Sequence, residues 1–338
     1  MSADSKSSSP ISFFKSSGAT FGTPERGIAA RRILKPRPIL CCLDPLERDD
    51  AGVLTLIESA RPFACGSEIR PVSVVSQVEL NWPLEYMAPL QAKLDRVEEK
   101  TLKPMLKGLS KKLTLSPRVL MQKGSSRRQT AEAILAYAER EKAKMIAVKT
   151  HGRRGFERFR LGSFAEILLT MSKIPVLAIN PKAEVPAQLK RVLFPTDFSV
   201  ASRRALRASL PWIKESQARV TLFHMSQFPI QYYSSYGEWQ LGLDPRMAEQ
   251  IQKDEENRAR RRGLRMRRHL ELQGIPCDFV QYRANADLAH AITGACKKES
   301  ADVILLASTA SRWARAILGS VARDVVVTAP RPVLVVHS

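Results

Sequence analysis

The sequence predicts an α/β protein made of two similar domains, each a mainly parallel five-stranded sheet with helices on both faces. Short apolar runs of strand length alternate with segments of helical periodicity between residues 38 and 182. The same order of runs and motifs returns between residues 190 and 338. Strands that alternate with helices need right-handed crossovers, and these place helices on both faces of a parallel sheet.

The first half contains the runs from which this fold class follows. Ile39–Leu43 is an uninterrupted apolar run, as expected of a strand buried on both faces. Between residues 130 and 142, apolar side chains recur at spacings of three and four, as on one face of a helix. Strands are therefore expected at 39–43, 69–78, 119–121, 145–148 and 175–179, and helices at 51–62, 83–112, 130–142 and from Ser163 onward.

The second half repeats the first at a nearly constant offset. Leu-Gly-Ser at 161–163 returns at 318–320, and Pro-Val-Leu at 175–177 returns at 332–334, both 157 residues later. The run at 143–146 returns 158 residues later, so the second copy lacks one residue within the loop between these landmarks. A repeat that keeps its order across both halves indicates a duplication.

The duplication predicts the division of the chain. We expect a mostly disordered basic arm at 1–37, a first domain at 38–182, a linker at 183–189 and a second domain at 190–338. The arm is rich in Ser, Gly and Pro and lacks an apolar core of secretory-signal length, although a transit peptide is an alternative interpretation.

The composition limits the class of partner and the compartment. Lys and Arg total 54 against 33 acidic residues, a formal net charge of +21, which favours anionic partners without choosing among nucleotide, nucleic acid and membrane surface. No stretch approaches the roughly 20 apolar residues of a membrane-spanning helix. The five cysteines have no C-x-x-C spacing, so we expect buried reduced thiols in a cytoplasmic protein, without a metal site or a disulfide framework.

The segment from Lys149 to Ser163 is the strongest candidate for a binding site. It leaves the buried run at 145–148 through a Gly- and Arg-rich loop and enters a helix that begins Gly-Ser. Backbone N–H groups at glycines can donate to a phosphate, and the positive end of a helix dipole attracts its negative charge. A structural interpretation is as good, because Ser163 and Glu166 have the spacing of a capping box that needs no ligand.

The spacing of the glycines resembles a known family. Gly152 and Gly162 are ten residues apart and Ser163 follows, which is similar to the nucleotide loop G-x2-G-x9-G-[S/T] of the universal stress protein family. The first glycine of that motif falls on Lys149, which is a departure from the family pattern. The resemblance covers the chain from residue 38 to 338 and implies Rossmann-like domains related to the adenine nucleotide α-hydrolases.

The resemblance implies a site for ATP or ADP in the first half, with Mg2+ or Mn2+ bound, if at all, through the phosphates. An Asp after the first strand holds the adenine or ribose side, a Val after the second strand lines the adenine pocket, and a Gly follows the third strand. By this comparison the binding residues are Asp44, Val74, Gly124, Lys149, His151, Gly152, Arg153, Gly162, Ser163 and Phe164.

The second half matches the nucleotide motif less well. In place of the glycine after the third strand, the second half has Arg283-Ala284-Asn285. Its counterpart of the phosphate loop has no glycine before Gly319. Asp197, Gly319 and Ser320 remain as weak candidates, so we expect this half to be a structural or regulatory partner. In the family the final strands pair across a two-fold axis, which here implies an intramolecular pseudo-dimer of the two domains. A homodimer is left open.

The implied function is that of an ATP- or ADP-binding stress-response protein in which the nucleotide regulates conformation or partner choice. No catalytic residue can be assigned, although slow ATP hydrolysis is left open. One alternative is an interaction scaffold of the same family that binds no nucleotide, as Lys149 suggests. The other is weak binding of a polyanion or nucleic acid through the Arg-rich helix at 255–268, which we do not favour because no reading motif accompanies it.

Overall fold

The computed structural model describes residues 37–43, 50–76, 95, 98–99, 106, 116–122, 124, 126–150, 161–226, 245–283, 287–308 and 318–337. Several sequence predictions lie outside these residues: the arm up to residue 36, most of the helix expected at 83–112, and four candidate binding residues, namely Asp44, His151, Gly152 and Arg153.

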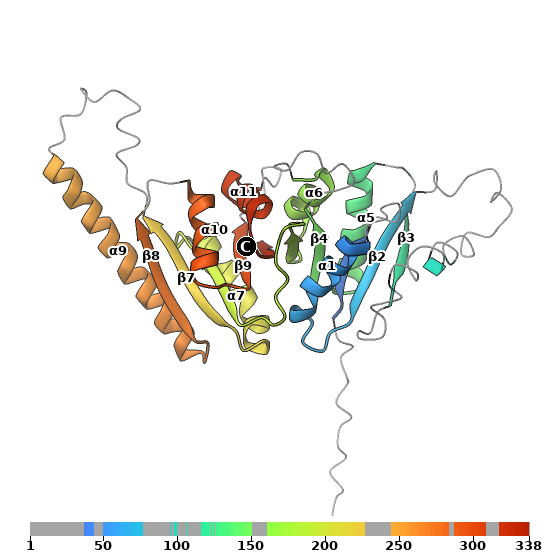
Figure 1. Ribbon diagram of the computed structural model, residues 1–338, viewed down its shortest axis with the longest axis horizontal. Coiled ribbons are helices and arrows are strands. Elements are labelled where there is room, and N and C mark those ends of the chain that lie inside the picture. The colour runs from blue at the N-terminus through green and yellow to red at the C-terminus, as the bar shows by residue number, and fades with distance from the viewer. Residues whose placement is uncertain are drawn as a thin grey trace, which may run out of the picture. The chain divides into compact units, whose positions relative to one another are not determined.

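The described strands form one ten-stranded sheet in the order β3-β2-β1-β4-β5-β10-β9-β6-β7-β8 (Figure 1). Every neighbouring pair is parallel except β5 with β10. The predicted fold class is confirmed, because each repeat contributes five strands in the same relative order. The strands are β1 Ile39–Leu43, β2 Ile69–Ser76, β3 Arg118–Gln122, β4 Met145–Lys149, β5 Val176–Ile179, β6 Arg191–Pro195, β7 Arg219–Ser226, β8 Cys277–Arg283, β9 Val303–Ser308 and β10 Val333–His337.

Helices cover both faces of the sheet, as the uninterrupted apolar strands require. In β1, Cys41 packs in a core shared with α1 and α7, whereas Leu40 and Cys42 pack in a core shared with α5 and α6. Successive side chains of a strand point to opposite faces, so a strand buried on both faces needs apolar residues throughout. The helices are α1 Asp50–Ala60, the 3-10 helix η1 Arg61–Phe63, α5 Arg127–Arg140, α6 Ser163–Met171, α7 Val200–Glu215, α9 Pro245–Leu272, α10 Leu288–Lys298 and α11 Ser320–Thr328.

The two repeats meet where β5 and β10 pair. Leu177 lies opposite Leu334, and these are equivalent positions of the repeats, so a local two-fold axis passes between them. Asn180, just after β5, donates a hydrogen bond to the carbonyl of Val327 near the end of α11. His337, at the end of β10, donates through Nε2 to the carbonyl of Leu169 near the end of α6, at 2.9 Å. The intramolecular pairing expected from the family is therefore present.

Across the same junction, equivalent positions of the two repeats carry opposite charges and form an ion pair. Glu166 of α6 pairs with Arg323 of α11, and these positions are also 157 residues apart. If the two repeats were identical, Glu would face Glu, or Arg would face Arg, at this position. The substitution of Arg for Glu in the second repeat therefore favours pairing between unlike repeats.

Local chemistry explains where the boundaries differ from expectation. Helix α5 begins at Arg127, three residues before the predicted start, because Ser126 caps it by accepting a hydrogen bond from the Gln129 backbone N–H at 3.2 Å. In α9, a Cβ on Gly263 would lie 2.3 Å from the ring of Phe279, so this glycine lets α9 approach β8 closely. Four cysteines are buried as expected, but Cys65 is only half-buried. In the part of the chain that the structure describes, no helix is both long and apolar enough to cross a membrane.

Candidate functional site

The carboxyl ends of β1 and β4 mark the candidate site in the first repeat. From β1 the chain proceeds outward to β2 and β3, and it then crosses back to place β4 on the other side of β1. Open α/β sheets bind ligands at such a reversal of strand order, outside the carboxyl ends of the strands. The described residues that reach this edge include Leu43, Ser76, Gln122 and Lys149, the last residues of four neighbouring strands.

The loop between β4 and α6 is closed at its base. The backbone N–H of Gly162 donates to the carbonyl of Thr150 at 2.7 Å, and the N–H of Thr150 donates to Ile179 of β5 at 2.9 Å. Thr150 is fully buried, so this base is anchored in the core. The residues between these anchors, with the candidates His151, Gly152 and Arg153, lie outside the described part of the chain.

The N-terminus of α6 carries no side-chain cap. Gly162 is the N-cap residue, with φ −62° and ψ 134°, and it has no side chain with which to accept from the first turn. The predicted capping box is therefore wrong: Ser163 is the first residue inside the helix, and Glu166 pairs with Arg323 instead. The first-turn N–H groups keep the positive end of the helix dipole available for an anion. Phe164 contributes one of these N–H groups, while its half-buried ring packs against the core.

Arg127 brings a cation to this helix end. Its Nη1 donates to Oγ of Ser163 at 3.0 Å, although 36 residues separate the two in sequence. Arg127 is also the first residue of α5, whose first turn contains no acidic residue. A guanidinium beside two positive helix ends is electrostatically unfavourable unless an anion joins them. Sequence reasoning missed this residue because only the packing of α5 against α6 brings it to Ser163.

The remaining candidates of the first repeat lie around the same edge. Gly124 follows β3, and a Cβ there would lie 2.2 Å from Oε1 of Gln129, so the amide of this exposed side chain occupies the space that the glycine leaves. Lys149 is the half-exposed last residue of β4. Val74 lies within β2, inside the strand expected at 69–78, two residues before the end of β2, and it is buried. The strand extends past Val74 because Val75 and Ser76 continue the register with β3.

The equivalent turn of the second repeat is held by its own hydrogen bonds. Oδ1 of Asp197 accepts from the backbone N–H of Ser199 at 2.9 Å, while Ser199, and not Asp197, caps α7. Burial raises the pKa of Asp197, but hydrogen bonds from Ser199 outweigh burial and leave that pKa below its ordinary value. Phe198, at φ 59°, packs on the ring of His224 at 4.8 Å between centroids. The carboxylate of Asp197 therefore holds its own turn.

Gly319 and Ser320 repeat the helix start of the first half. Gly319 is the N-cap of α11 and again has no side-chain cap, and Ser320 is the exposed first residue of the helix. A Cβ on Gly319 would meet nothing within 4 Å. Among the described residues, no group of three or more His, Cys, Asp or Glu side chains is placed to hold a metal ion.

Solved structures show what this chain is similar to. A universal stress protein from Archaeoglobus fulgidus matches 88% of this chain and 98% of its own at 20% identity, with a TM-score of 0.58. A putative universal stress protein from Pseudomonas aeruginosa UCBPP-PA14 matches 89% of this chain and 93% of its own at 15% identity, with a TM-score of 0.53. Over 44% of this chain and 91% of its own, a family protein from Arabidopsis thaliana solved with AMP bound matches at 17% identity, with a TM-score of 0.30.

The comparison of the sequence with family models shows the family to which the chain belongs. No curated protein matches this sequence. The family model of the universal stress protein family matches residues 36–180 and again residues 188–337, which together span most of the chain and correspond to the two repeats. Together with the duplicated fold, this double match shows that the chain belongs to the universal stress protein family.

Proposed function

We propose that the first repeat binds ATP or ADP and that the bound nucleotide regulates the conformation or the partners of this stress-response protein. The observation that carries the proposal is the start of α6. A helix N-terminus without a side-chain cap, Arg127 beside it, and a loop closed at its base by Gly162 all meet at the reversal of strand order. This arrangement suits a chain of phosphates.

We assign the parts of the nucleotide as follows. The first-turn N–H groups of α6 would donate hydrogen bonds to the phosphates, and Arg127 would pair with them through its planar fork. Gly162 would close the base of the loop through its hydrogen bond to Thr150. Asp44 would hold the ribose or adenine, with the main chain near Val74 and Gly124 on either side. Lys149, His151, Gly152 and Arg153 would complete the phosphate loop, and Mg2+ or Mn2+ would bind only through the phosphates.

The second repeat would serve as a structural or regulatory partner. Its Asp197 is held within its own turn, and its loop lacks the two inner glycines of the first repeat. We keep the division into an arm at 1–37, domains at 38–182 and 190–338, and a linker at 183–189. We also place the protein in the cytoplasm, because its buried cysteines are unpaired, as in a reducing compartment. We assign no catalytic residue.

Two measurements test the nucleotide site. Mass spectrometry of the gently purified full-length protein should find adenine nucleotide, and calorimetry of the emptied protein should recover binding of added ATP. Gly152→Val should abolish that binding, because the added side chain removes backbone freedom and fills space that the phosphates need. Ala310→Val, in the corresponding loop of the second repeat, is the matched control and should leave binding unchanged. Protein that is empty and takes up no ATP would favour the interaction scaffold.

A further inference from the structure

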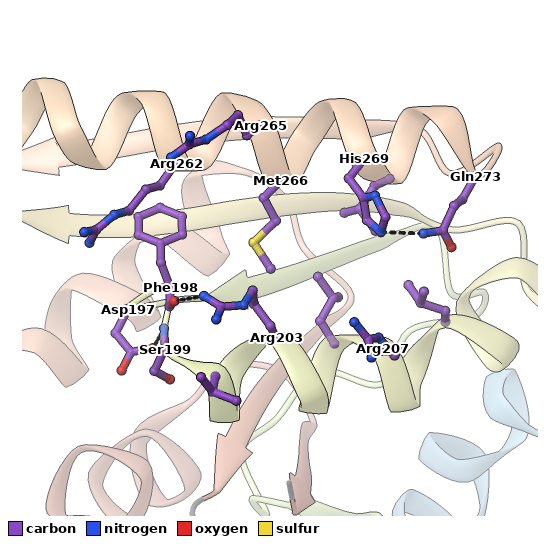
Figure 2. A pocket seen from close by; sticks show the side chains of 14 residues that line it. Asp197, Phe198, Ser199, Arg203, Arg207, Arg262, Arg265, Met266, His269 and Gln273 are labelled. Atoms are coloured by element: carbon purple, nitrogen blue, oxygen red, sulfur yellow. Dashed lines mark hydrogen bonds between the residues drawn. The ribbon is translucent and has the colours of Figure 1, made fainter.

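A groove of about 880 Å3 runs between α7 and α9 in the second repeat (Figure 2). Its lining residues recur every three or four positions from Ser199 to Leu210 on the α7 side and from Arg262 to Gln273 on the α9 side. At 1.5 Å per residue, each wall is about 16 Å long, or about three helical turns. The groove is therefore elongated and has helical walls on both sides.

Both walls carry arginines. Arg207 and Arg262 are exposed, and among the described residues neither has an acidic partner within ion-pair distance, whereas Arg258 of the same helix pairs with Glu255 at 2.6 Å. Arg203 donates to the carbonyl of Phe198 and also faces the groove. The acidic residue in the lining, Asp197, is at one end and already accepts a backbone hydrogen bond. The groove thus has a net positive charge.

The floor between these walls is apolar. Half-buried Leu210 and Met266 line it and give a ligand apolar surface to contact, next to Leu206 and Leu270, which are almost fully buried. An apolar stripe flanked by cations on both sides is complementary to one class of ligand, an apolar stripe flanked by carboxylates.

The arginines of the α7 wall are not shared by the two repeats. The equivalent helix of the first repeat, α1, contains no Lys or Arg. At the offset of 153 residues between the two copies of this helix, Arg203 corresponds to Asp50 and Arg207 to Leu54. The positive charge of the α7 wall is therefore specific to the second repeat.

We infer that this groove binds an acidic amphipathic helix of a partner protein. A helix laid in the groove would place apolar residues, spaced three and four apart, on the floor and its acidic residues against Arg207 and Arg262. A single-stranded nucleic acid needs exposed aromatic rings on which its bases stack. Phe198 is 7% exposed, and the one exposed ring among the lining residues, His269, is hydrogen-bonded to Gln273 at 2.8 Å, so the groove offers no series of rings. The chain's own N-terminal arm is basic and does not complement the groove.

The test selects ligands without assuming their sequence. Random 12-residue peptides displayed on phage are selected against the full-length protein, and the enriched peptides are synthesised with a fluorophore for anisotropy. We expect acidic sequences with apolar residues at helical spacing. The double variant Arg207→Glu with Arg262→Glu should weaken their binding about tenfold, as expected for reversing two exposed charge contacts. The matched control, Arg204→Glu with Arg261→Glu, changes the net charge equally on the same helices outside the groove and should change the Kd less than twofold.

Three results would overturn the inference. One is enrichment of peptides without acidic residues, or no enrichment at all. Another is equal loss of binding in the groove variant and its control, which would reveal diffuse charge attraction. The last is that a 20-nucleotide oligo(dT) competes with the peptides and binds more tightly than they do, which would assign the arginines to nucleic acid. Circular dichroism and thermal denaturation of both double variants verify that each is folded, and the outcome does not depend on nucleotide binding by the first repeat.

Discussion

Replacing Arg127 by Ala tests the proposed phosphate site most directly. Its guanidinium contacts the first residue of α6 and is placed to meet an anion there. A hydrogen bond between a charged group and its partner contributes about 1.5–3 kcal/mol. Because Arg127 is exposed, we take the lower end, about 1.5 kcal/mol, which corresponds to about a tenfold increase in the Kd for ATP.

The same substitution should leave the empty protein nearly as stable as before. Removing the Ser163 hydrogen bond costs about 0.5–1.5 kcal/mol. Removing a cation from the positive ends of two helices returns about 0.3–1 kcal/mol for each end. These effects oppose one another, so we expect the Tm without nucleotide to change little while the affinity falls.

Calorimetry of the full-length protein with ATP provides the assay, and Arg128→Ala is the matched control. Arg128 is the neighbouring residue, 72% exposed, and pairs with Glu132 at 2.9 Å, away from Ser163. We expect its loss to leave the Kd unchanged, and Arg127→Lys to give an intermediate Kd, because an ammonium keeps the charge without the fork. The reasoning fails if Arg127→Ala binds ATP like the wild type, or if both alanine variants weaken binding equally.

Three further predictions concern the fold. Gly263→Ala should lower the free energy of unfolding by about 1–3 kcal/mol through overpacking against Phe279. Gly294→Ala, in open space on α10, should raise the free energy of unfolding by up to about 1 kcal/mol. Urea denaturation measures both, and equal effects would contradict the packing argument. Burial lowers the pKa of His337 below its ordinary 6.5, so the folded protein holds the neutral ring, and its stability contribution is present above about pH 6.5 and lost below it. The fall in Tm from pH 7.5 to 5.5 should therefore be smaller in His337→Asn, and an unchanged fall would reject this assignment. Glu166→Arg should destabilise the junction by up to about 1 kcal/mol, and adding Arg323→Glu should restore it in a double-mutant cycle; additive losses would show that the pair is not coupled.

The strand and helix that flank the candidate site could be predicted from local pattern, and the errors have local causes. Gly162 and Ser163 were correctly placed at the start of a helix because a loop signal and an apolar period meet there. The capping box failed because the helix begins at Ser163, so its hydroxyl is one position too late to cap. Strand β3 extends one residue beyond the prediction at each end, to Arg118 and Gln122, because its pairing with β2 continues there. Sequence periodicity does not encode where a ladder between strands stops.

The alternation of strands and helices, the duplication and the unequal glycine content of the two repeats can all be read from the amino-acid sequence, because each depends on neighbouring residues or on offsets along the chain. The packing of the folded chain is needed to show that Arg127 meets Ser163, that Glu166 meets Arg323, and that two helices of the second repeat enclose a cationic groove. Such contacts join residues far apart in the chain. They depend on strand register and on the packing of helices against the sheet, which local patterns of apolar and polar residues leave open.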